Sequence, residues 1–155
     1  MADAALSVRP ATADDARSIW EWRNDPTTRA MSGDVDDIAW EVHTRWFEQA
    51  LVDSARRLLV VQLEDTAVGM VRFDDIDDGT WRISVNLAPA ARGRGHGTAA
   101  LVRACDWLAT HDRPRAVTAD IRTGNVASVR AFEAAGFRRV GGDAEWERYL
   151  RTFEA

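Results

Sequence analysis

The sequence contains no lysine, so all 20 of its lysine-or-arginine positions are arginines, and it contains only one cysteine. A single cysteine excludes an internal disulfide and a multi-cysteine zinc site, and three scattered histidines do not supply a metal site either. No apolar run is long enough to span a bilayer, and the N-terminus lacks the basic and apolar segments of a secretory signal. We therefore expect a cytoplasmic protein with no bound metal and no membrane partner.

The formal net charge of -5 narrows the choice of partners further. Non-specific nucleic-acid binding needs clustered cations that neutralise phosphates, so we expect no nucleic-acid partner. A chain of 155 residues, 46% of them hydrophobic, is long enough to bury one sizeable core. No repeat, linker or low-complexity stretch divides it. We therefore expect residues 1–155 to form one domain.

The apolar pattern predicts an α/β fold. Alternation and short apolar runs predict strands at 6–9, 58–63, 67–73, 81–87, 116–121 and 146–153, with a short additional strand near 138–141. Helical spacing predicts four main helices, at 12–24, at 37–52, directly after the glycine-rich segment at 92–97, and at 126–136. Residues 74–79 are predicted to form a polar turn. This order of elements indicates a single α/β domain with a mixed sheet.

A glycine- and arginine-rich segment, Arg92-Gly93-Arg94-Gly95-His96-Gly97, lies between a predicted strand and a predicted helix. Glycines permit tight turns and bring N–H groups close to a ligand. Free N–H groups at a helix start favour an anion such as pyrophosphate, and the two arginines add positive charge. The segment lacks the Gly-Lys-Ser/Thr ending of a nucleotide-triphosphatase loop and the glycine spacing of a dinucleotide fold. A plain structural turn is the alternative.

A second segment, from Asn125 to Phe137, follows the next predicted strand. Together the two segments contain Arg-x-x-Gly-x-Gly, then Asn-x-x-Ser, an aromatic residue four positions later, and Gly-Phe. This combination resembles the GNAT superfamily of N-acetyltransferases, over essentially the whole chain. The resemblance implies an enzyme that uses acetyl-CoA as its cosubstrate.

The resemblance also implies where the coenzyme binds. Two parallel strands, here 81–87 and 116–121, splay apart, and the pantetheine arm lies between them like an extra strand. A splayed edge leaves backbone groups unpaired, and an amide-bearing ligand can satisfy them. The implied coenzyme site comprises Val85, Asn86, Leu87, Arg92, Gly93, Arg94, Gly95, His96, Gly97, Thr98, Asn125, Ser128 and Phe132.

The catalytic groups are less clearly marked. Asp120 lies where ribosomal-protein alanine acetyltransferases of the superfamily carry a glutamate, so it is the candidate base; it could instead cap a turn or pair with Arg122, and ordered water could carry the proton. The backbone of Val85, Asn86 and Leu87 is implied to pair with the pantetheine arm and to polarise the thioester carbonyl. In the superfamily a tyrosine commonly serves as the general acid, and Phe132 stands at its position here, with no proton to donate. Tyr149 is the alternative acid, or else a packing residue.

The acceptor site is expected to involve the N-terminal half. The segments containing Trp22, Arg23 and Asn24, and His43 and Trp46, resemble the branch that acetylates nucleotide-linked amino sugars, such as the pseudaminic-acid pathway enzyme. Arg23 or Arg29 could then meet a phosphate. Ordinary helix packing is the alternative for these residues.

Two acidic clusters support a different acceptor. They would attract a cationic amine if they lay near the mouth of the site, although such turns are commonly only solvated. They are Asp34, Asp36, Asp37 and Asp74, Asp75, Asp77, Asp78.

Three functions therefore stay open. The first is acetylation of a small-molecule amine, including an amino sugar. The second is acetylation of protein N-termini or side chains. The third is a non-catalytic acetyl-CoA-binding module. Whether the protein forms a homodimer is also left open by the sequence.

Overall fold

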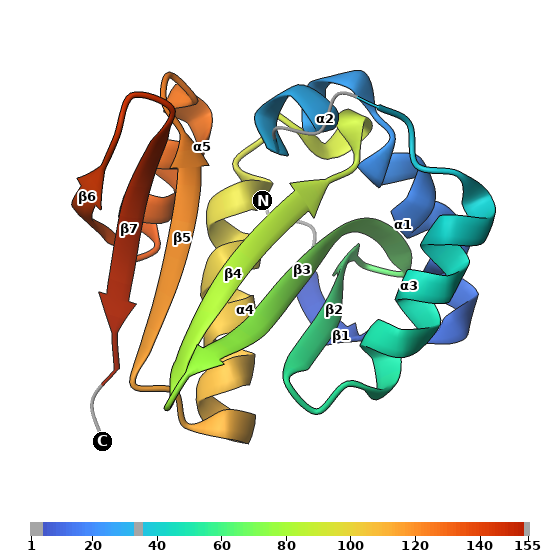
Figure 1. Cartoon of the computed structure of the whole chain (residues 1–155), viewed down its shortest axis with the longest axis horizontal. Coiled ribbons are helices and arrows are strands. Elements are labelled where there is room, and N and C mark those ends of the chain that lie inside the picture. Colours follow the sequence, from blue (N-terminus) through green and yellow to red (C-terminus); the bar gives the residue numbers. More distant parts are fainter. Residues whose placement is uncertain (1–4, 33–35, 154–155) are drawn as a thin grey trace.

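A mixed sheet of seven strands, in the order β1-β2-β3-β4-β5-β7-β6, organises the residues that the computed structural model describes, which are 5–32 and 36–153 (Figure 1). Its strands are β1 (Leu6–Pro10), β2 (Arg56–Leu63), β3 (Thr66–Asp77), β4 (Thr80–Leu87), β5 (Ala116–Arg122), β6 (Arg138–Gly142) and β7 (Trp146–Thr152). The helices are α1 (Ala16–Arg23), α2 (Pro26–Ser32), α3 (Trp40–Val52), α4 (His96–Asp112) and α5 (Val126–Ala134). The predicted α/β class and mixed sheet are confirmed.

The structure differs from the prediction in two places. Residues Pro26–Ser32 form α2, between the helices that the sequence predicts at 12–24 and 37–52, because proline fits the first position of a helix and the Asp25 carboxylate accepts a hydrogen bond from the Thr28 N–H at 3.1 Å. Most of the predicted polar turn at 74–79 instead extends β3 to Asp77. The turn itself is reduced to Asp78 and Gly79, both with positive φ, a conformation that suits a tight hairpin.

Helices pack against both faces of the sheet, but they cover one face only in part. On one face, α4 and α5 pack against alternate strand residues such as Val71, Ile83 and Val117. On the other face, α1 and α3 pack against Leu58, Val60 and Met70. Figure 1 shows α4 crossing behind β4, whereas no helix in the described part of the chain crosses in front of β4, β5 and β7. That side of the three strands is called the open face below.

Cys105 lies fully buried on α4, where burial raises the pKa of its thiol to about 11. It is therefore a core residue, as its apolar surroundings in the sequence indicate. In the described part of the chain, no helix has both the length and the apolar character needed to cross a membrane.

The sheet opens between β4 and β5. These parallel strands are paired only from Thr80 to Arg82 on β4 and from Ala116 to Thr118 on β5. Beyond this point the remaining residues of both strands have no register with each other, although β4 stays paired with β3 and β5 with β7. The predicted splay is thus present, and it leaves a gap lined by main-chain groups.

Candidate active site

The glycine loop joins the end of β4 to the start of α4. Gly93 and Gly95 have φ values of 73° and 80°, in the left-handed region that favours glycine. A Cβ atom at either position would meet no atom within 4 Å, so the main chain is uncovered there. Gly95 is the N-cap of the 17-residue helix α4, whose first N–H groups and dipole favour an anion. The loop therefore has the open backbone that a bound pyrophosphate requires.

Gly97 differs from Gly93 and Gly95 because it lies within α4. A Cβ atom there would come 3.6 Å from the Cβ of Ala131 on α5, an ordinary van der Waals contact, so the packing of the two helices does not require a glycine at this position. His96 and Thr98 flank it in the first turn of α4, and both are half-buried.

The two arginines of the loop differ in their contacts. Arg92 donates from Nε to the Leu87 carbonyl at 3.2 Å, from Nη1 to the Asp25 carboxylate at 2.9 Å, and from Nη2 to the Thr28 hydroxyl. Its guanidinium lowers the pKa of the Asp25 carboxyl. Arg94, by contrast, is exposed. Arg92 thus fastens the loop to the start of α2, and Arg94 is the arginine placed to meet a ligand.

The main chain of β4 presents alternate residues to the gap. The Ala88 N–H donates to the Val68 carbonyl at 2.7 Å, and the antiparallel register continues through Asn86 and Met70. In such a ladder, successive residues turn their polar groups to opposite sides. The N–H and C=O of Val85 and Leu87 therefore face the gap, whereas those of Asn86 face β3, contrary to expectation. The Asn86 side chain accepts a hydrogen bond from the Thr28 hydroxyl at 3.2 Å.

The start of α5 is capped by the motif asparagine. Asn125 Oδ1 accepts a hydrogen bond from the Ser128 N–H at 3.2 Å, so Asn-x-x-Ser acts here as a helix N-cap. Phe132 is buried and packs edge-on against Phe137, with ring centroids 5.0 Å apart. The structure thus places Phe132 in the core cluster that also contains residues of β4 and β5.

Asp120 and Tyr149 lie on opposite faces of the sheet. The Asp120 carboxylate contacts Arg148 at 3.2 Å and Arg82 at 3.7 Å, and not Arg122, which stacks on Trp146. Tyr149 is buried on the α4 side, where burial raises the pKa of its phenol, and the carboxylates of two nearby glutamates raise it further. The two candidates for proton transfer therefore do not meet at one point.

Three of the expected acceptor residues support the structure instead of lining a surface. Trp22 is buried, and Asn24 binds the main chain of Ile38 through two hydrogen bonds of 2.7 and 2.9 Å. His43 is fully buried between Arg23 Nη1, 3.0 Å from its Nδ1, and the Ala16 carbonyl, 2.8 Å from its Nε2. Burial lowers the pKa of His43, so the ring is neutral, with Nδ1 accepting and Nε2–H donating.

Arg23 and Trp46 both contact His43 and also contact each other. The Arg23 guanidinium lies 4.2 Å from the centre of the Trp46 ring, a cation–π distance. Arg29 forms an ion pair with Asp37 at 3.3 Å, and Asp74 pairs with Arg56 and Arg72 at 3.4 and 3.1 Å. The acidic clusters are therefore partly neutralised by arginines rather than gathered into one acidic mouth; Asp34 lies outside the described residues.

Sequence reasoning missed the residues that surround these candidates. Arg82 and Arg148 flank Asp120, and Asp25 and Thr28 hold Arg92. A signal for Arg82 existed, because a charged residue that alternates with apolar ones marks the uncovered face of a strand. No local sequence pattern predicts that Arg148 contacts Asp120, because the two residues lie on different strands.

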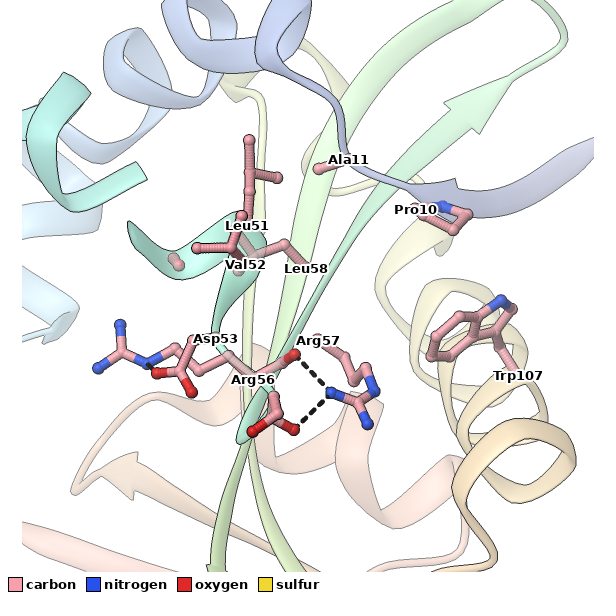
Figure 2. A pocket seen from close by; sticks show the side chains of 11 residues that line it. Pro10, Ala11, Leu51, Val52, Asp53, Arg56, Arg57, Leu58 and Trp107 are labelled. Carbon is pink, nitrogen blue, oxygen red and sulfur yellow. Dashed lines mark hydrogen bonds and ion pairs between the residues drawn. The ribbon is translucent and has the colours of Figure 1, made fainter. Parts of the chain in front are cut away.

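A cavity of about 310 Å³ lies away from this site, at the other end of the sheet (Figure 2). It is bounded by the end of α3, the start of β2 and Trp107 of α4. There Arg56 contacts Asp53 at 3.5 Å, and Arg57 donates to two main-chain carbonyls at 2.8 Å. These contacts satisfy the charged groups of the cavity within the chain, and none of the expected site residues lines it.

Comparison with known proteins supports the same assignment. Residues 5–138 match the family model described as the acetyltransferase (GNAT) domain. A search of curated proteins finds no significant match. Among solved structures, spermidine N-acetyltransferase from Vibrio cholerae, in complex with CoA and spermine, is 19% identical with a TM-score of 0.87, and the alignment covers 95% of each chain.

Two further structures are similar. Aminoglycoside acetyltransferase AAC(6')-Ib, with an aminoglycoside and acetyl-CoA, is 17% identical with a TM-score of 0.82, covering 96% of this chain and 93% of that one. A protein assigned as a phosphinothricin N-acetyltransferase is 21% identical with a TM-score of 0.82, covering 97% and 100%. At these identities the likeness concerns the fold. The family model, which spans most of the chain, shows that this protein belongs to the GNAT acetyltransferases and is an acetyl-CoA-dependent N-acetyltransferase.

Proposed function

We propose that the protein transfers the acetyl group of acetyl-CoA to a primary amine of a small molecule, with an amino sugar or nucleotide-linked amino sugar as the specific acceptor. One observation carries the donor half of this proposal: β4 and β5 part after three residue pairs, beside a loop whose glycines leave the main chain uncovered. Such a gap and loop fit the amide-bearing arm and the pyrophosphate of the coenzyme.

The residues of the chain divide the donor work between them. The main chain of Val85 binds the arm and orients the thioester carbonyl, and the N–H groups from Gly93 to Thr98 hold the pyrophosphate, with Arg94 adding charge. Arg92 and Asn125 keep the loop and α5 in place through their hydrogen bonds. When bound, acetyl-CoA supplies the acetyl group as a thioester. The amine nitrogen then forms a bond to the carbonyl carbon as the carbon–sulfur bond breaks.

Proton transfer falls to Asp120 or to a water molecule beside it. Asp120 lies on the open face, two residues along β5 from the last residue that is paired with β4. Each of its oxygens contacts one arginine, and a carboxylate has about four lone-pair sites, so sites remain that can take the amine proton. The departing thiolate receives its proton from solvent or from the product, since Phe132 cannot donate one and Tyr149 lies on the other face.

A second function deserves a test because one observation favours it. Arg82, Ser84 and Arg148 are exposed on the open face, which no helix in the described part of the chain crosses (Figure 1), so a peptide N-terminus could reach them. Turnover with a peptide acceptor would therefore indicate that the protein acetylates the N-termini of other proteins. A protein that binds acetyl-CoA without turning it over would be a non-catalytic module.

An acetyl-CoA consumption screen tests these alternatives. It would compare amino sugars, nucleotide-linked amino sugars, polyamines and peptides, with coenzyme binding measured in parallel by calorimetry. We expect acetyl-CoA to bind and a small amine to release free CoA. Turnover with peptides alone would replace the small-molecule proposal, and binding without turnover would leave only the module. Failure to bind acetyl-CoA would overturn the donor assignment.

A further inference from the structure

The open face carries an excess of positive charge, although the whole chain has a net charge of -5. Side chains at alternate strand positions share a face, and the register pairs Arg82 with Thr118, Asp120 with Arg148, and Arg122 with Trp146. On this face, β4, β5 and β7 therefore present three arginines and one aspartate and no other charged residue. One carboxylate cannot neutralise three guanidinium groups.

The excess charge lies beside the expected point of acetyl transfer. Arg82 belongs to the last pair before β4 and β5 part, and Asp120 lies two residues further along β5. Asp120 is shared by the two arginines through different oxygens, with Arg148 at 3.2 Å from Oδ1 and Arg82 at 3.7 Å from Oδ2. The Arg82 and Arg148 side chains are 44% and 60% exposed, so a ligand can reach both. A negative group there would find guanidinium donors that are only partly engaged.

We propose that Arg82 and Arg148 bind an anionic group of the acceptor, a carboxylate or a phosphate, while the acceptor amine lies at Asp120. This inference rests on the proposed function and names the class of its substrate: an amine that carries an anion a few bonds away. Arginine suits this task because its planar guanidinium can bind carboxylate and phosphate oxygens in pairs. Polycations such as spermidine and the aminoglycosides, which are named for two of the similar structures, would be repelled by the same surface.

Matched pairs of amines test the proposal. Ethanolamine is compared with O-phosphoethanolamine for the phosphate arm, and β-alaninamide with β-alanine for the carboxylate arm, with spermidine as a polycation. We expect kcat/KM to favour the anionic member of at least one pair by about tenfold or more, as hydrogen bonds to charged groups allow. The pair that shows the preference identifies the anion. Equal rates within both pairs, or spermidine as the best acceptor, would overturn the proposal.

Variants place the effect on the named residues. Arg82→Gln and Arg148→Gln should each reduce the preference for the anionic member, and Arg82→Lys should restore part of it. Arg45→Gln, at an exposed position on α3, is the matched control and should keep the full preference. Thermal unfolding checks that each variant folds. If Arg82→Gln and Arg148→Gln both fold and retain the preference, the open face does not bind the anion.

Calorimetry separates this inference from the proposed function. If acetyl-CoA binds but no amine is acetylated, the proposed function fails, and the anion site is then judged by binding of O-phosphoethanolamine and β-alanine to the coenzyme-saturated protein. Binding of either that weakens in Arg82→Gln but not in Arg45→Gln supports the site. Binding of neither, or binding unaffected by Arg82→Gln, overturns it.

Discussion

The two sides of the β4–β5 gap are built from different parts of the chain. On the donor side, the uncovered groups are main-chain ones, at Val85 and around Gly93 and Gly95. On the proposed acceptor side, the groups are side chains that different strands bring together, such as Arg82, Asp120 and Arg148. A site made of main chain depends on backbone shape, whereas a site made of side chains depends on which residues the register places opposite one another.

This difference predicts different responses to substitution. Changing the backbone freedom of the donor side should alter coenzyme affinity, whatever acceptor is offered. Changing a side chain on the acceptor side should alter turnover and acceptor choice, with little effect on coenzyme affinity. A donor-side substitution that changes acceptor choice, or an acceptor-side substitution that changes coenzyme affinity, would show that the two sides are not separate.

The largest effect is expected at Gly95. In Gly95→Val, a branched side chain would occupy the space that the ligand needs and would also force a φ of 80° on a residue that disfavours it. Affinity for acetyl-CoA, measured by calorimetry, should fall by about a hundredfold or more, equivalent to roughly 3 kcal/mol. Gly141→Val is the control, because Gly141 also has open space for a Cβ but does not have a positive φ. Equal affinities in the two variants would remove the loop from the coenzyme site.

The next largest effect is expected at Asp120. If its carboxylate takes the amine proton, Asp120→Asn should lower kcat by about 10²-fold, within the usual range for a general base. The affinity for acetyl-CoA should stay the same, because the donor side does not use this side chain. Asp65→Asn, in the exposed turn between β2 and β3, serves as the control. A loss smaller than about threefold would assign the proton to water, as expected if general-base catalysis contributes little here.

A smaller effect should distinguish the two loop arginines. Arg92→Gln removes hydrogen bonds to Asp25, Thr28 and Leu87, so it should lower the free energy of unfolding by about 1–2 kcal/mol. Arg94→Gln should leave stability unchanged and weaken acetyl-CoA binding several-fold, with the loss decreasing at high salt. Denaturant unfolding and calorimetry on both variants check this. The reverse pattern would show that Arg92 binds the coenzyme and Arg94 supports the fold.

The comparison also explains what the sequence could predict. The glycine loop and the strands that flank it are local features, and the pattern of residues 92–97 with 125–137 predicts the family, which the family model confirms, and a donor side that stays a prediction. Helix α2 was missed because Pro26 commonly ends a helix, although here it begins one. Residues 74–77 suggested a turn because they are mostly acidic, yet they continue β3 as an exposed strand end. The partners of Asp120 could not be predicted, since they depend on the register of three strands.

His43 shows the same limit on what the sequence could predict. Its helical position borders the apolar stripe of α3, so the sequence is compatible with either packing or a place at the site. The structure settles its environment: the ring is stacked on Phe47 at 5.6 Å between centroids and is bound by Arg23 and the Ala16 carbonyl. The neutral His43 ring thus supports the Arg23–Trp46 contact, because its Nδ1 accepts a hydrogen bond from the Arg23 guanidinium.

The smallest effect is expected from protonation of this histidine. Because the pKa of His43 in the folded state lies below its ordinary value of about 6.5, the unfolded chain binds a proton more readily than the folded protein. This contribution to stability is present above about pH 6.5 and is lost as the pH falls from there toward the folded-state pKa. Protonation would also place a positive charge against the Arg23 guanidinium, 3.0 Å away, and would remove the acceptor at Nδ1. Unfolding measured from pH 7.5 to 5 should therefore show a steeper fall in stability for the wild type than for His43→Gln. Parallel curves for wild type and His43→Gln would mean that the folded protein accepts the charged ring, and that the Arg23–Trp46 contact does not depend on a neutral histidine.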